Sequence, residues 1–71
     1  MRDIEHRGCR IEPQPYLSVG GRWMAEAIVV VNDRGLVRTV PIFGQLRTFA
    51  TEEEADAWAV EIAKTWINKR G

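Results

Sequence analysis

The stretch 22–31, RWMAEAIVVV, decides the fold of this chain. It ends in β-branched residues and contains no glycine or proline, so it predicts a β-strand. Its odd-numbered positions are all apolar, and most of its even-numbered positions are apolar as well. A strand that is apolar on both sides is typical of the centre of a sheet. We therefore expect this stretch to be the central strand.

Turn signals on both sides of this stretch predict its neighbours. Before it, the glycines of 19–21 tolerate the positive φ of a tight turn, and the alternating pattern of 8–14 predicts a first strand. After it, the segment 32–35, NDRG, predicts a type I turn that closes with a bulge. A third strand then follows over 36–42. In this register Arg38 lies across from Val30.

A helix signal follows the strands. Thr51 and Glu54 have the spacing of an N-cap residue and its capping-box glutamate, so the helix is expected over about 52–69. Its apolar positions recur at helical spacing and predict a face that packs on the sheet. They are Ala55, Trp58, Ala59, Ile62 and Trp66, widened by Val60, Ala63 and Ile67.

These elements predict an α+β fold, namely a three-stranded antiparallel meander sheet with one C-terminal amphipathic helix packed on one face. The whole chain, 1–71, is expected to form one domain, with 1–7 as a loosely ordered lead-in. A chain of 71 residues has room for one core and buries only about 60% of its unfolded surface. Oligomerisation is therefore an available source of further stability.

Composition limits the classes of function. Cys9 is the one cysteine, so no disulfide forms within the chain, and a cytoplasmic location is expected. No segment approaches the ~20 apolar residues that cross a bilayer, so a membrane role is not expected. The formal net charge is zero, so no overall field attracts nucleic acid or anionic lipid.

No motif indicates catalysis. His6 and Cys9 have the spacing of half a metal site, but no second ligand pair exists. The acidic segment 52–56 fits the positive end of a helix better than a catalytic or cation site. The glycines do not have a phosphate-binding spacing. We therefore expect no enzyme activity, no cofactor, no metal and no small-molecule substrate.

Part of the sequence resembles a known group of proteins. The resemblance rests on the motifs Gly20-Gly21-Arg22-Trp23, Phe49-Ala50-Thr51-x-Glu53-Glu54-Ala55-x-x-Trp58-Ala59 and Ala63-x-x-Trp66-Ile67. They resemble small uncharacterised bacterial β-β-β-α proteins, a likeness that implies the fold and no activity. The element order is also similar to a double-stranded RNA-binding domain that lacks its first helix. That family places lysines at the start of its last helix, where this chain has glutamates.

Two functional hypotheses follow. The first is a non-catalytic interaction module, expected to bind a second copy or another protein through the sheet face opposite the helix, here called the outer face. Its candidate interface residues are Met24, Ile28, Val30, Val40 and Ile42. The alternative is nucleic-acid binding by arginines of the same face. Its candidate contacts are Arg10, Arg22, Arg38 and Arg47.

Overall fold

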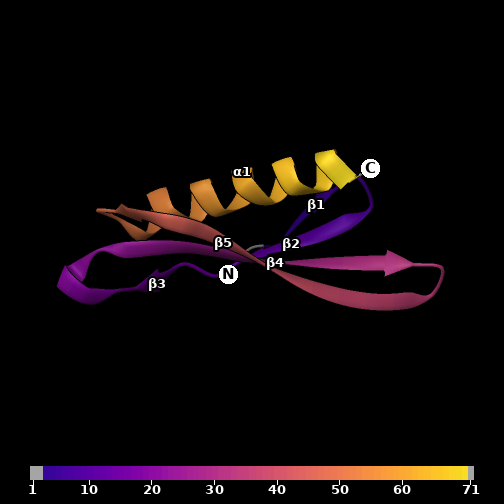
Figure 1. Ribbon diagram of the computed structural model, residues 1–71, viewed down its shortest axis with the longest axis horizontal. Helices are drawn as coiled ribbons and strands as arrows, with labels where there is room; N and C mark the ends of the chain where they lie inside the picture. The colour runs from indigo at the N-terminus through magenta and orange to yellow at the C-terminus, as the bar shows by residue number, and fades with distance from the viewer. Residues whose placement is uncertain (1–2, 71) are drawn as a thin grey trace.

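The computed structural model describes residues 3–70, apart from the side chains of residues 44–46. Its elements in chain order are β1 (Ile4–His6), β2 (Cys9–Pro13), β3 (Tyr16–Leu17), the 3-10 turn η1 (Val19–Gly21), β4 (Trp23–Asp33), β5 (Leu36–Phe49) and α1 (Glu52–Arg70). The predicted class is confirmed, because an antiparallel sheet carries one C-terminal helix on one face (Figure 1). The predicted strand number is wrong, since the sheet has five strands rather than three.

Strand β4 lies at the centre of the sheet, as its sequence predicts. It pairs with β5 on one side, and with β2 and the short β3 on the other. The unexpected strand is β1, which pairs with β2 and places Ile4 opposite Ile11. The segment 1–7 was expected to be loosely ordered, and for Ile4–His6 this is wrong, because Ile4 packs against the core.

The hairpin between β4 and β5 is tighter than the sequence predicted. Asp33 pairs with Leu36, which leaves Arg34 and Gly35 as the turn, with φ angles of 53° and 84°. Positive φ at both turn residues is typical of a type I′ turn, whose twist matches that of the strands. The register is therefore shifted by one residue, and Val30 pairs with Thr39 instead of Arg38. Such a shift moves every β5 side chain to the other face.

Strand β5 continues to Phe49, whereas the predicted third strand ended at residue 42. It is an edge strand that contains Pro41 opposite Ile28. Hydrogen-bonded and non-hydrogen-bonded pairs alternate along β4 and β5, beginning with the hydrogen-bonded pair of Asp33 and Leu36 that closes the turn. Pro41 and Ile28 therefore form a non-hydrogen-bonded pair, and the nitrogen of Pro41 points to the open edge of the sheet. The missing N–H therefore costs no hydrogen bond to β4, which explains why proline is tolerated here.

The core lies between β4 and α1 and is built largely from small side chains. Among the described residues Ile11 and Val29 are the largest that are fully buried. Around them lie five buried alanines: Ala25, Ala27, Ala55, Ala59 and Ala63. The predicted helix face is thus confirmed in part, since its alanines occupy the centre while Trp58 and Trp66 lie half-buried beside them. Alanines on both layers let the helix lie close to the sheet.

The helix begins as predicted. The hydroxyl of Thr51 accepts a 3.2 Å hydrogen bond from the Glu54 N–H and donates a 3.1 Å bond to the Glu54 carboxylate. This satisfies one of the helix N–H groups that have no partner within the helix.

Replacement of Thr51 by alanine is expected to lower the free energy of unfolding by about 1 kcal/mol, because this N-cap is lost. Thr65→Ala is the matched control, since the Thr65 hydroxyl only bonds back to the Glu61 carbonyl at 3.0 Å. Such bonds contribute little to helix stability. Urea unfolding of the two variants checks the prediction, and equal midpoints would contradict it.

Candidate functional site

The outer face of the sheet is the side opposite α1 (Figure 1). The even-numbered residues of β4 point to this side, since its odd-numbered residues from Ala25 to Val31 are buried on the helix side. Directly paired residues of an antiparallel sheet point to the same face. The register therefore decides which residues of β2, β3 and β5 join the outer face.

Three of the five predicted interface residues lie on this face. Met24, Ile28 and Val30 occupy even-numbered positions of β4 and are each half-buried, and Glu26 lies between Met24 and Ile28. The other two, Val40 and Ile42, pair with Val29 and Ala27 and so face the helix, and Ile42 packs against the core. Their assignment to the outer face is wrong, because it rested on the one-residue register error.

The same register brings other apolar residues onto the outer face. Val37 and Phe43 of β5 are 63% and 61% exposed, and Tyr16 of β3 is 45% exposed opposite Met24. Pro41 lies between the two β5 residues, opposite Ile28. The sequence signal that could have found them is the Arg34-Gly35 pair, once it is interpreted as a complete two-residue turn. We call the apolar residues of this face the outer patch: Tyr16, Met24, Ile28, Val30, Val37, Pro41 and Phe43.

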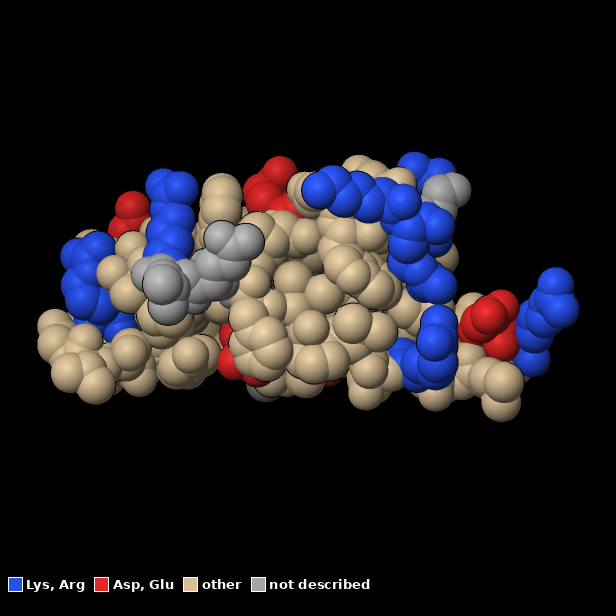
Figure 2. Space-filling view, in the orientation of Figure 1, with Lys and Arg blue, Asp and Glu red and all other residues tan. Residues whose placement is uncertain are grey.

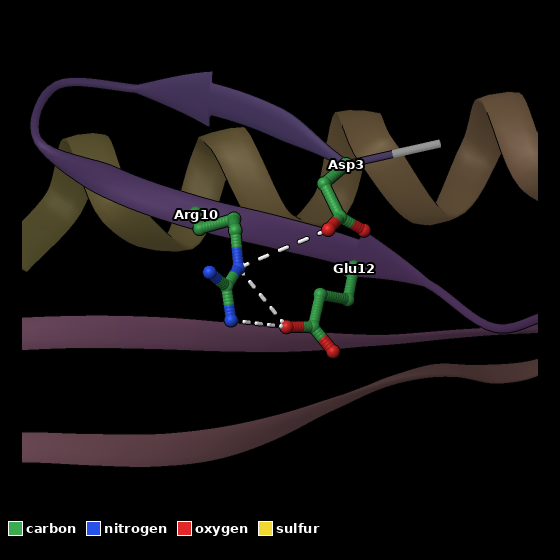
Figure 3. Close-up of polar contacts among 3 residues, drawn as sticks. All are labelled: Asp3, Arg10 and Glu12. Atoms are coloured by element: carbon green, nitrogen blue, oxygen red, sulfur yellow. Dashed lines mark hydrogen bonds and ion pairs between the residues drawn. The ribbon is translucent and has the colours of Figure 1, made fainter. Parts of the chain in front are cut away.

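Charged residues of β2 border the outer patch (Figure 3). The guanidinium of Arg10 donates to the Glu12 carboxylate at 3.0 and 2.8 Å, and its Nε lies 4.0 Å from an oxygen of Asp3. Glu12 pairs with Ile28, so this group lies directly beside the centre of the patch. The ion pair is half-exposed and adds little stability. The outer face is thus polar along β2 and mostly apolar along β4 and β5, where Glu26 and Thr39 interrupt the apolar residues.

The structure separates the four arginines that were expected to form a nucleic-acid surface. Arg10 lies on the outer face within its ion pair, and Arg22 donates to the Thr48 hydroxyl at 3.1 Å. Arg38 pairs with the helix-facing Val31. Arg47 stacks on the helix side, with its guanidinium carbon 4.7 Å from the Trp58 ring centre and 5.4 Å from that of Phe49. The predicted placement on the outer face is confirmed for Arg10 and is wrong for Arg38 and Arg47.

His6 and Cys9, which were considered for metal or catalytic chemistry, have roles in holding the fold together. His6 Nε2 donates to the Asn68 side-chain oxygen at 2.9 Å, which ties β1 to the helix, and the Cys9 thiol is buried. No group of three or more metal-ligating side chains occurs within the described part of the chain. In the same residues, no helix has the length and apolar character needed to span a membrane.

The tryptophans border the core. Trp23 packs against the core and is half-buried. Trp58 lies 6.2 Å from Phe49 between ring centres, and Arg70 stacks over Trp66 at 5.2 Å. Arginines thus cover part of both helix tryptophans, and these rings stabilise the edges of the helix contact.

Comparison of the chain with protein-family models, curated proteins and solved structures found no match.

Proposed function

We propose that the chain is a non-catalytic protein-interaction module that self-associates through the outer patch. The observation that carries this proposal is the group of apolar residues Met24, Ile28 and Val30, interrupted by Glu26 and extended by Val37 and Phe43, which are more than half exposed. Apolar side chains that gather on one face of a small domain are typical of an interaction surface. In contrast, scattered exposed residues such as Val19 are ordinary.

Other features of the molecule favour a second copy of the chain as the partner that binds the outer patch. Among the described residues, five of the eleven buried hydrophobic residues are alanines and the cysteine is free, so the fold has few large buried side chains and no disulfide. Domains of this size commonly gain stability by oligomerisation. The net charge of zero means that two copies do not repel each other at long range.

The outer patch also suits a symmetric contact. In a two-fold dimer the same patch is buried on both copies, so Ile28 at its centre would lie near the axis. The polar row of Arg10 and Glu12 would then form the rim, where charged side chains keep contact with water.

Replacement of Ile28 by glutamate is expected to convert a dimer into a folded monomer. The new carboxylate would lie opposite Glu12 and two residues from Glu26, so both copies would bury like charges without partners. Light scattering over a concentration series measures the mass, and circular dichroism checks the fold. Val19→Glu is the matched control, because Val19 is 95% exposed outside the patch, and it should leave the dimer intact.

Two outcomes would overturn the proposal. If the wild-type protein stays monomeric at the highest concentration, self-association is ruled out. If both glutamate variants lose the dimer, then either the contact lies outside the outer patch or the added negative charge alone separates the two copies.

A further inference from the structure

Both tight turns at one end of the sheet hold an arginine in the left-handed region. Arg7 has φ of 51° and precedes Gly8 at 81°, and Arg34 has φ of 53° and precedes Gly35 at 84°. Within residues 3–70 these two arginines are the non-glycine residues with positive φ. Asparagine, aspartate and glycine are the usual residues at this turn position, and a long side chain is disfavoured. Folding alone therefore does not explain the two arginines.

The register brings these turns together. His6 pairs with Cys9, Cys9 with Val31 and Val31 with Arg38, so these residues form one row across the sheet. With strands about 4.8 Å apart, the two turns lie about 10 Å apart across the sheet. Along the strands they are about 7 Å apart, because β4 and β5 pair for two residues beyond this row, up to Asp33 and Leu36. The helix ends beside the β1–β2 turn (Figure 1), because Asn68 accepts from His6 at 2.9 Å and from Arg7 at 3.4 Å, and the tip of the β4–β5 hairpin projects beyond the helix end.

Exposed cations gather at this end of the molecule, here called the basic end. Its members are Arg7, Arg34, Arg38, Lys69 and Arg70. Figure 2 shows blue side chains over the end of the helix and the tip of the hairpin, at the right of the view. Asp33 is the acidic residue beside the hairpin turn, whereas Glu52, Glu53 and Glu54 lie in the first turn of the helix and Glu61 at its middle. Compensation of the helix dipole explains Lys69 and Arg70 but not the arginines of the two turns.

The shape of the basic end suits a long polyanion. All residues of 32–39 are exposed, so the tip of the β4–β5 hairpin projects as a two-stranded ribbon beyond the layer covered by α1 (Figure 1). The major groove of DNA is about 12 Å wide and admits such a ribbon. Duplex DNA carries one charge per about 1.7 Å of axis, so arginines in turns roughly 12 Å apart can contact one duplex.

We propose that the basic end binds the phosphate backbone of duplex DNA, with the β4–β5 hairpin directed into the major groove. The guanidinium groups of Arg7 and Arg34 would each bind a phosphate through two parallel N–H donors. This surface differs from the outer patch, so the inference does not depend on self-association. It also differs from the set of Arg10, Arg22, Arg38 and Arg47, of which it retains Arg38 alone.

The double variant Arg7→Asn with Arg34→Asn tests the proposal, because asparagine before glycine is a preferred type I′ pair. Its melting temperature should equal or exceed that of the wild type. Fluorescence anisotropy with a labelled duplex of about 20 base pairs, at about 20 to 200 mM salt, measures binding. We expect at least about tenfold weaker binding at the lowest salt, and a salt slope reduced by about two.

The control is the double variant Arg22→Asn with Arg47→Asn, which removes the same charge away from the basic end. It should bind within about twofold of the wild type, since it loses no phosphate contact. The proposal is overturned by a wild type that does not bind, or by equal losses in both double variants. Displacement of the duplex by poly-L-glutamate at equal charge would also overturn it, in favour of an acidic protein partner.

Discussion

Ile11→Ala is expected to unfold much of the protein at room temperature. Ile11 has no exposed surface, and it pairs with Ile4 on one side and Val29 on the other. Loss of a fully buried isoleucine side chain typically costs about 2 to 5 kcal/mol, because the site cannot close completely around alanine. A core of this size supplies about 3 to 5 kcal/mol in total. One substitution can therefore remove most of the free energy of unfolding.

Urea unfolding followed by tryptophan fluorescence, at one fixed protein concentration, measures this loss. Val19→Ala serves as the control, because Val19 is 95% exposed and its truncation should change stability by less than about 0.5 kcal/mol. An Ile11→Ala variant that unfolds at the wild-type midpoint would show that β2 contributes little to the core.

Local signals in the sequence were sufficient for the centre of the fold. Most of the stretch 22–31 lies in β4, because a segment without glycine or proline and with β-branched residues suits a central strand. The helix begins at Glu52, as predicted, because Thr51 and Glu54 are close in sequence and form their contact within one turn. In both cases the deciding residues are neighbours along the chain.

The candidate site could be predicted only in part, because it depends on register. The predicted type I turn at 32–35 and the observed type I′ turn at 33–36 differ in the φ of Arg34, and arginine does not indicate the positive value that it adopts. The difference is one residue of register, yet it moves Val40 and Ile42 to the helix side and places Phe43 on the outer face. Periodicity within each strand holds equally well in both registers.

Strand β1 and the basic end could not be predicted from the sequence either. Strand β1 is three residues long and is held by its pairing to β2 and by the contact of His6 with Asn68. So short a segment has no periodicity from which to predict a strand. The basic end has the same origin, because its cations come from two turns, β5 and the end of α1, which only the folded sheet brings together.

Ala59→Leu is expected to destabilise the protein nearly as strongly as the loss of Ile11. Ala59 has no exposed surface and lies between Ala55 and Ala63 on the face that contacts the sheet, where Ala25 and Ala27 are also buried. Extra carbon atoms there must push the helix outward, and overpacking of this kind typically costs about 1 to 3 kcal/mol. Outward movement would also loosen the half-buried Trp58.

Ala57→Leu is the matched control, because it places the same side chain on the exposed side of the same helix. Alanine and leucine have similar helix propensities, so this control should change the free energy of unfolding by less than about 0.5 kcal/mol. Urea unfolding measures both variants, and the tryptophan emission of the native state should shift to the red in Ala59→Leu alone. Equal stability of the two variants would mean that the helix is held by Trp58 and Trp66 at its edges, and that the alanines only fill the space between them.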